Sequence, residues 1–314
     1  MIKKLNIFIT GGAGYIGSML ATDLVKLGHI VTVLDNLTYT KNSLSHLKKK
    51  KNFKLIVGNV LNKTLMKKLI KNQDFIIPLA GLVGAPLCDR YPKLAKSVNL
   101  NSIIFIRKCL KKNQKVVFAT TNSGYGIGKK NKFCTERSKL NPISLYGRTK
   151  VQAEKEIMKF KNSISFRLAT VFGKSYRMRT DLLVNNFVWE AMKNKKLILF
   201  EPHFRRNYIH VKDIVKVFIF SIKNFNKLKS NVYNVGLSSA NLTKLSLARK
   251  IKKKVKNLKI EINNNKTDPD KRDYFVSNKK IEKKGFKAKF SIENGISELL
   301  KTYKSQKFRI LNNY

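Results

Sequence analysis

The sequence has few acidic residues and no long apolar segment. Its 314 residues include 66 lysines and arginines but only 18 aspartates and glutamates. No run of 18 or more apolar residues occurs, so we expect no segment to cross a membrane. Residues 1–10 carry two lysines followed by a short apolar run that leads into glycines. This pattern predicts a first strand rather than a signal peptide, and hence a cytoplasmic protein.

Cysteine is also scarce. Cys88, Cys109 and Cys134 are odd in number and lack the spacing of metal ligands. The sequence therefore indicates neither a disulfide framework nor a metal site. Thiols in a reducing compartment are the expected state.

The formal charge of +48 raises the alternative of a nucleic-acid binder. Lysine supplies most of this charge, and the lysines are spread along the whole chain. A nucleic-acid surface more often groups arginines with aromatic residues. We therefore expect no specific nucleic-acid partner, while attraction to small anions remains compatible with the charge. The alternative predicts DNA affinity that falls steeply with salt.

The first half of the chain alternates short apolar runs with longer amphipathic stretches. This alternation predicts an α/β fold, a Rossmann-type doubly wound parallel sheet covered by helices on both faces. The expected strands are residues 5–10, 30–35, 54–58, 75–80, 115–120 and 164–169.

The rhythm weakens after residue 175. Helix-like stretches follow at 181–194, 211–225 and 242–256, and a turn-rich segment covers 268–273. We expect a cofactor domain over 1–175 and a smaller, mainly substrate-binding domain over 176–314, with parts of 205–235 returning to the first. Ligands are expected in the crevice between the two, at the carboxyl edge of the sheet.

A glycine turn joins the first strand to an amphipathic helix. Gly11, Gly14 and Gly17 follow a Gly-x-x-Gly-x-x-Gly pattern. Glycines allow a tight turn and a close approach of the backbone to a diphosphate, at which the helix points its free N–H groups. Tyr15 and Ile16, inside the turn, are further candidate cofactor residues. The flanking strand and helix make this turn a specific dinucleotide-binding signal.

Asp35 ends the second expected strand, eighteen residues after Gly17. A carboxylate there accepts hydrogen bonds from the adenosine ribose and repels a 2′-phosphate. Asp35, with Asn36 beside it, therefore predicts NAD rather than NADP as the cofactor.

Tyr146 and Lys150 lie four residues apart at the start of a helix-like stretch, and so share a helix face. We expect the lysine ammonium, together with the positive charge of the nicotinamide, to favour the tyrosine phenolate, because an unperturbed tyrosine titrates near ~10. The phenolate could then take a proton from a substrate alcohol while hydride leaves the same carbon.

A polar cluster, residues 119–126, follows the fifth expected strand. It should lie at the carboxyl edge of the sheet, where a hydroxyl could bind the reacting oxygen. Capping of a turn is the competing role for its threonines and serines.

With these motifs in order, the chain resembles the extended short-chain dehydrogenase/reductase family, the NAD-dependent nucleotide-sugar epimerases and dehydratases. The resemblance implies that Thr121 completes a Thr–Tyr–Lys triad and that Lys150 also holds the nicotinamide ribose. It further implies a set of residues along the dinucleotide: Asn59, Val60, Leu79, Ala80, Gly81 and Asn99.

The same resemblance implies a nucleotide-sugar substrate. Arg206 and Arg272 would hold its diphosphate or nucleotide, with Asn186 nearby, since a guanidinium pairs well with phosphate oxygens. A surface ion pair is the competing role for either arginine. Thr121 and Asn122 are the substrate candidates next to the reacting carbon.

Two positions depart from the family pattern. Asn59 stands where an aspartate is usual, so it can bind adenine but lacks the charge. Asn122 and Ser123 stand where the 4,6-dehydratases carry Asp and Glu. Neither side chain can act as an acid or base at neutral pH, which argues against 4,6-dehydration.

Several stretches resemble one branch more narrowly, the GDP-D-glycero-D-manno-heptose 4-dehydrogenases of surface-polysaccharide synthesis. They are residues 78–88, 122–128, 167–173, 177–185, 203–211 and 268–278. The expected reaction is oxidation of a sugar 4-hydroxyl by NAD. A 4-epimerase would return the hydride to the other face, whereas a dehydrogenase would release the 4-keto sugar, and the triad alone does not separate them.

The resemblance also implies a homodimer, joined through two long helices at about 91–112 and 143–161. A protein that senses NAD(H) without turnover is a further alternative. The intact Thr121, Tyr146 and Lys150 argue against it.

Overall fold

A computed structural model describes residues 3–129, 132–265, 272–305 and 312–313. Most of the turn-rich segment expected at 268–273 therefore lies outside the described residues, and only Arg272 and Asp273 are placed.

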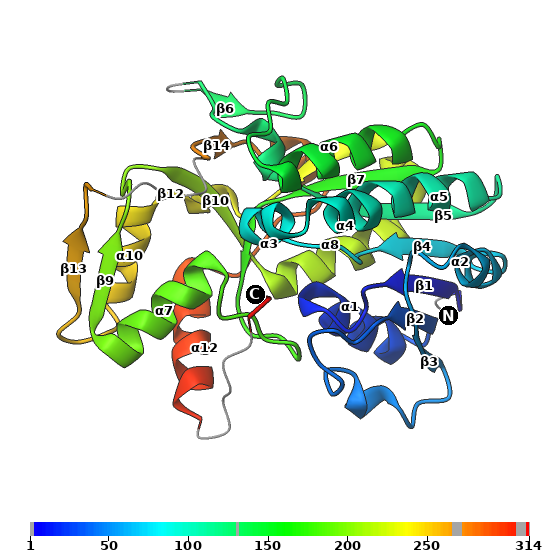
Figure 1. Cartoon of the computed structure of the whole chain (residues 1–314), viewed down its shortest axis with the longest axis horizontal. Helices are drawn as coiled ribbons and strands as arrows, with labels where there is room; N and C mark the ends of the chain where they lie inside the picture. Colours follow the sequence, from blue (N-terminus) through cyan, green and yellow to red (C-terminus); the bar gives the residue numbers. More distant parts are fainter. Residues whose placement is uncertain (1–2, 130–131, 266–271, 306–311, 314) are drawn as a thin grey trace.

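Seven parallel strands form the main sheet, in the order β11-β7-β5-β4-β1-β2-β3 (Figure 1). The α/β prediction, with its parallel sheet, is confirmed. The strands are β1 (Asn6–Thr10), β2 (Ile30–Asp35), β3 (Phe53–Val57), β4 (Phe75–Pro78), β5 (Lys115–Thr121), β7 (Ser163–Leu168) and β11 (Asn231–Val235). The first six correspond to the strands expected from the sequence.

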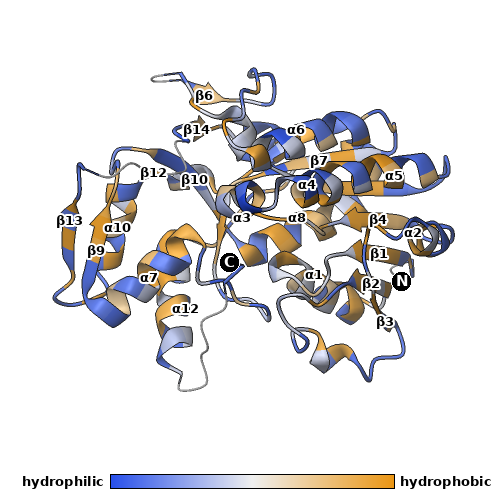
Figure 2. Ribbon diagram, in the orientation of Figure 1, coloured by the Kyte–Doolittle hydropathy of each residue, from blue (hydrophilic) through white to orange (hydrophobic). Residues whose placement is uncertain are grey.

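Helices cover both faces of this sheet, as the continuous apolar runs of its strands require. In β1, Ile7 and Ile9 pack toward α1 (Tyr15–Lys26) and α8 (Val211–Lys223). Phe8 points the other way, toward α2 (Lys63–Ile70), α5 (Ser102–Cys109) and α6 (Leu145–Ile157). All three side chains are fully buried, and Figure 2 shows the strands of this region largely in the hydrophobic colour.

The second part of the chain has its own core. It contains β8 (Thr170–Phe172), β10 (Arg205–His210) and β12 (Asn241–Thr243) in one small sheet, and the pair β9 (Lys196–Leu199) and β13 (Lys259–Ile262) in another. Helices α7 (Leu183–Asn194), α10 (Lys244–Lys252) and α12 (Ile292–Lys304) pack around them. The remaining described elements are β6 (Phe133–Cys134), β14 (Phe275–Val276), α3 (Ala85–Arg90), α4 (Pro92–Lys96), α9 (Phe225–Leu228) and α11 (Lys279–Glu282).

The chain crosses back to the main sheet after β10. Helix α8 packs beside α1, and β11 then pairs with β7 in parallel register from Asn231 to Val235. The main sheet therefore includes residues well beyond 175. The exact domain boundary stays a prediction.

The helical stretch expected at 91–112 is interrupted. It consists of α4, a π-helical turn at Ser97–Asn101, and α5, while the stretch expected at 143–161 corresponds to α6. The homodimer through these helices stays a prediction. Among the described helices, none combines the length and apolarity that a membrane span needs.

One carboxylate links the two parts of the molecule. Glu298 on α12 pairs with the imidazole of His210 at 2.8 Å and with Lys212, and accepts a hydrogen bond from the Lys174 amide at 2.9 Å. Burial alone would raise the pKa of Glu298, but these partners outweigh it and lower the pKa to about 2. Ion pairing of Glu298 is therefore expected to stabilise the fold at neutral pH.

We expect Glu298→Gln to lower the free energy of unfolding at pH 7 by roughly 3 kcal/mol. A carboxyl whose pKa is lower in the folded state stabilises the fold at pH values above its pKa in the unfolded chain. This stabilisation is lost as the pH falls toward its pKa in the folded state, near 2. The difference between wild type and variant should therefore shrink between pH 5 and pH 2. Urea unfolding across that range measures it. Glu293→Gln, which alters a more exposed pair with Lys250, should change stability much less.

Candidate active site

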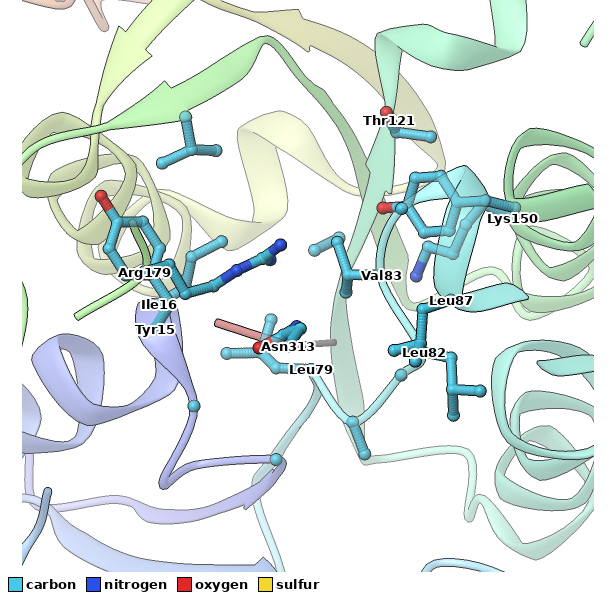
Figure 3. Close-up of a pocket in the computed structure, with 18 of the residues that line it drawn as sticks. Tyr15, Ile16, Leu79, Leu82, Val83, Leu87, Thr121, Lys150, Arg179 and Asn313 are labelled. Atoms are coloured by element: carbon cyan, nitrogen blue, oxygen red, sulfur yellow. The ribbon is translucent and has the colours of Figure 1, made fainter. Parts of the chain in front are cut away.

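A cleft of about 910 Å³ opens at the carboxyl ends of the main strands, between the two parts of the chain. Most residues selected from the sequence line it. They are Gly11, Gly14, Tyr15, Ile16, Gly17, Asp35, Asn36, Asn59, Val60, Leu79, Ala80, Gly81, Thr121, Tyr146, Lys150, Asn186, Arg206 and Arg272. In Figure 3, Thr121 and Lys150 lie on one side of this cavity, and Tyr15 and Ile16 on the other.

The glycine turn is as tight as its sequence predicts. Gly11 has a φ of +70°, and a Cβ there would lie 2.5 Å from the Ala80 nitrogen. A Cβ on Gly17 would lie 2.4 Å from the Gly11 carbonyl oxygen. Gly14 precedes α1 without a side-chain cap, so the first amides of that helix remain open toward the cleft. Bare backbone beside a helix N-terminus suits a diphosphate.

Asp35 stands at the end of β2, beside this turn. Its carboxylate accepts hydrogen bonds from the amides of Ala13 at 2.9 Å and Leu37 at 2.8 Å. Burial raises its pKa from the ordinary value, with these two hydrogen bonds opposing the rise. Each oxygen has a second lone pair that a ribose hydroxyl could use. The turn and Asp35 together fit the diphosphate and adenosine ribose of a dinucleotide.

Two further cofactor candidates use their polar atoms within the protein. Asn59 lines the cleft, but its Oδ1 accepts from the Leu61 amide at 2.9 Å. The Tyr15 hydroxyl donates to the Gly173 carbonyl at 2.6 Å, which leaves the backbone of Tyr15 as its contribution to the turn.

Asn99 does not line the cleft. Its amide exchanges two hydrogen bonds with the backbone of Leu82, each 2.9 Å long. Leu82 continues the strand end of Leu79 to Gly81, which does line the cleft. Asn99 therefore positions that loop and does not itself face the cleft where a cofactor would bind. Spacing along the sequence could not separate these two roles.

Helix α6 presents Tyr146 and Lys150 to the cleft. Ser144 caps its start by accepting from the Gly147 amide at 3.1 Å, so Tyr146 falls in the first turn. The Lys150 ammonium lies 4.3 Å from the centre of the Phe118 ring on β5. Burial lowers the pKa of Lys150 to about 8 and raises that of Tyr146 to about 12.

Without NAD, the pKa of Tyr146 is therefore raised, and its lowering by Lys150 together with the nicotinamide charge stays a prediction. Removal of the phenolate from water outweighs the influence of nearby Arg272 and of a hydrogen bond with Thr121, both of which lower the pKa. Lys150 is itself buried, which weakens its charged form. An additional positive charge near the hydroxyl would be needed to make the phenolate available at neutral pH.

A buried ion pair fixes α6 on the sheet. Arg167 on β7 donates to Glu154 on α6 from Nη2 at 2.6 Å, and both side chains are more than 90% buried. Ser165 adds a hydrogen bond to the same carboxylate. Glu154 is one helical turn beyond Lys150, so this pair positions the helix that carries Tyr146 and Lys150. Arg167 also donates to the Tyr125 hydroxyl at 3.1 Å, which ties down the loop after β5.

Thr121 ends β5 and meets a short chain of polar groups. Its hydroxyl lies 2.8 Å from that of Ser123 and accepts from the Ser123 amide. Arg272 donates to the Ser123 hydroxyl. Thr121 also hydrogen-bonds Tyr146. Thr121, Ser123, Tyr146 and Arg272 thus form one connected group on the cleft wall. Thr121 has the capping role considered for it, in addition to its place beside Tyr146.

Asn122 does not take the substrate-facing place expected for it. It is 1% exposed and does not line the cleft. Its amide nitrogen and oxygen have no hydrogen-bond partner among the described residues. The short 3₁₀ turn Asn122–Tyr125 directs Ser123 toward the cleft and Asn122 inward. The side chain that faces the reacting region is therefore a hydroxyl.

The substrate candidates also line the cleft. Arg206 on β10 is 2% exposed, and its guanidinium lies 5.8 Å from the Tyr274 ring. Asn186 lies in the first turn of α7. One cleft therefore contains the glycine turn, Tyr146 and the arginines Arg206 and Arg272.

Four further cleft residues were not selected from the sequence. Arg177, Arg179 and Asp181 lie in the loop between β8 and α7, and Tyr39 follows β2. Arg179 and Asp181 form an ion pair. The only sequence signal was the stretch 177–185, noted for its resemblance but given no role. Among the described residues, no cluster of histidine, cysteine, aspartate or glutamate is arranged as a metal site.

The sequence pattern of the "NAD dependent epimerase/dehydratase family" matches residues 7–236. The chain belongs to this family. The family depends on NAD, and the prediction of NAD as cofactor is confirmed.

Individual relatives carry different activities. The chain is 29% identical to the dTDP-D-glucose 4,6-dehydratase of Dictyostelium discoideum over 78% of this chain, and spans only 61% of that protein. It is 28% identical to the UDP-glucose 4-epimerase of Lactobacillus helveticus, over 79% of this chain and 82% of the relative. The structure resembles UDP-glucose 4-epimerase from Thermotoga maritima, solved with UDP-glucose, with a TM-score of 0.84 and 22% identity over 96% and 99% of the two chains. That likeness establishes the shared fold.

Nothing in these similarities points to the GDP-heptose 4-dehydrogenases in particular. The broad resemblance to nucleotide-sugar epimerases and dehydratases is confirmed. The narrower one has no support beyond the stretches noted in the sequence.

Proposed function

We propose that this chain is a nucleotide-sugar 4-epimerase that oxidises and re-reduces C4 of its substrate. The observation that carries the proposal is the group formed by Thr121 and Tyr146 at the cleft, with Lys150 on the same helix face as Tyr146. Ser123 stands beside this group, at a position where 4,6-dehydratases carry a carboxylate. A 4-epimerase among the relatives, matched over most of its length, supports the same conclusion.

Each protein residue has a distinct task. Tyr146 takes the proton from the 4-hydroxyl and later returns one to the 4-oxygen, while Thr121 holds that oxygen in line. NAD, when bound, accepts and returns the hydride, and its oxidised ring supplies positive charge that favours the Tyr146 phenolate. Lys150 adds to that positive charge and holds the ribose next to the ring. The glycine turn and Asp35 hold the diphosphate and adenosine.

The cleft walls argue against a 4,6-dehydratase. Elimination of water across C5 and C6 needs an acid and a base beside the sugar. Ser123 is a hydroxyl, and the Asn122 amide faces away from the cleft. Neither group exchanges protons at neutral pH.

The dehydrogenase alternative uses the same first step. It differs in releasing the 4-keto sugar and passing the hydride to a second oxidant. The resemblance of residues 78–88 and 177–185 to GDP-heptose 4-dehydrogenases favours it, and it is the second candidate. Arg206 and Arg272 suit the diphosphate of either a UDP- or a GDP-linked sugar.

The decisive experiment identifies the product. Purified protein is incubated with UDP-glucose and, separately, with GDP-D-glycero-D-manno-heptose, each with and without a 2-oxo acid as hydride acceptor, and products are identified by NMR. We expect a 4-epimer without any acceptor. A 4-keto sugar that accumulates only when the acceptor is present would overturn the epimerase proposal in favour of the dehydrogenase. A 4-keto-6-deoxy product would overturn the argument from Asn122 and Ser123.

A further inference from the structure

Arg177 is a buried cation whose hydrogen bonds are not all made. Its side chain lines the cleft, yet the residue is 2% exposed. Its Nε and Nη1 have no hydrogen-bond partner among the described residues. A buried guanidinium with unmade hydrogen bonds is costly, and native proteins keep few such groups without a reason. Guanidinium N–H groups without a partner suit the oxygen atoms of an anion.

The loop that carries Arg177 is fastened to the start of α1. The Tyr15 hydroxyl donates to the Gly173 carbonyl at 2.6 Å. The Ser175 hydroxyl donates to the Tyr15 carbonyl at 2.6 Å and lies 3.2 Å from the Ser18 hydroxyl. These bonds place the loop against the helix N-terminus and the glycine turn, which is the diphosphate end of the cleft.

Other contacts hold the guanidinium itself. Its central carbon lies 4.8 Å from the centre of the Tyr39 ring, which follows β2 by four residues. Nη2 donates to the backbone carbonyl of Asn312 at 3.2 Å. Figure 3 shows the neighbouring Asn313 at the cavity, which it also lines. With Nη2 engaged and one face covered by an aromatic ring, the donors that remain are Nε and Nη1, which lie on different edges of the guanidinium.

The charges around Arg177 leave it in need of an anion. Asp35 is close enough to influence it, but that carboxylate is engaged by the amides of Ala13 and Leu37. Asp181 pairs with Arg179. Burial, together with the neighbouring Arg179, lowers the pKa of Arg177 to about 10. A bound phosphate would offset both effects.

We propose that Arg177 binds a phosphate of the cofactor's diphosphate, through the N–H group of Nε or of Nη1. The glycine turn supplies uncharged amides to this diphosphate, and Arg177 supplies the cation that they lack. Tyr39 and Asn312 are positioning residues that hold the guanidinium in place. The inference concerns the cofactor half of the cleft, and does not depend on which sugar is the substrate.

A series of ligand fragments tests this assignment. Dissociation constants for ADP-ribose, ADP, adenosine and UDP are measured by calorimetry on protein stripped of bound nucleotide. Arg177→Met should weaken ADP-ribose and ADP binding about 10- to 100-fold. Adenosine, which lacks the phosphates, and UDP, which Arg206 and Arg272 would hold, should change less than about twofold.

Two more variants sharpen the test. Lys174→Met removes an exposed cation from the same loop and should leave all four constants unchanged. Arg177→Gln keeps a polar side chain without the charge. If the Met variant does not fold, the same four dissociation constants are compared between Arg177→Gln and the wild type. Unchanged ADP-ribose binding would overturn the proposal, as would equal losses for adenosine and ADP. A loss confined to UDP would instead assign Arg177 to the substrate.

Discussion

Replacing Tyr146 by phenylalanine is expected to reduce kcat by about a thousandfold, because proton transfer by a positioned group contributes about 10²- to 10⁴-fold. Only the hydroxyl group is removed, and the ring remains to fill its half-buried place on α6. Steady-state turnover of the sugar that proves active measures the effect. The same preparation should retain NAD and bind the sugar nucleotide as the wild type does.

Tyr176→Phe is the matched control for this substitution. Tyr176 is half exposed, does not line the cleft, and stacks on His46 with ring centres 4.1 Å apart. Loss of its hydroxyl should leave kcat within about twofold. Full activity of Tyr146→Phe would contradict the proposed acid–base role of Tyr146, whichever product is formed.

Gly17→Ala is expected to weaken NAD binding by at least about a hundredfold. The new Cβ would lie 2.4 Å from the Gly11 carbonyl oxygen and 2.6 Å from the Gly12 Cα, both of them backbone atoms. The glycine turn must therefore move, and the amides that it offers to the diphosphate move with it. The nucleotide released on denaturing the purified protein, together with a titration with NAD, measures the loss.

Gly28→Ala separates this effect from a general cost of adding a methyl group. Gly28 has a φ of +86°, but a Cβ there would meet no described atom within 4 Å, and the residue follows the far end of α1. Its replacement should cost roughly 1 kcal/mol of stability through backbone strain, with NAD affinity unchanged. If Gly17→Ala kept its full complement of NAD, the glycine turn would not be the diphosphate site.

The sequence predictions that succeeded depend on residues that lie close together along the chain. The strand ending at Asp35 and the helix starting after Gly14 follow from apolar periodicity and from glycine spacing, which act over a few residues. Tyr146 and Lys150 share a helix face because four residues make about one turn. Such relations are present in the chain before it folds.

The predictions that failed depended on side-chain direction. Asn99 and Asn122 lie beside cleft residues in the sequence, yet Asn99 holds the Leu82 backbone and Asn122 points inward. The pKa of Tyr146 in the protein without NAD is raised, because it depends on how much water the fold removes from the hydroxyl. Neither outcome could be read from spacing.

The sequence by itself determined the α/β class and the glycine turn. It also predicted Asp35 as the mark of NAD, and its family resemblance implied Thr121, Tyr146 and Lys150 as the triad. Only the tertiary structure decided which side chains meet. It brought the loop after β8 against the start of α1, across more than 150 residues, and so placed Arg177 in the cofactor half of the cleft. The physical reason is that a motif is fixed by short-range geometry, whereas burial and the pairing of charges arise only when distant segments pack together.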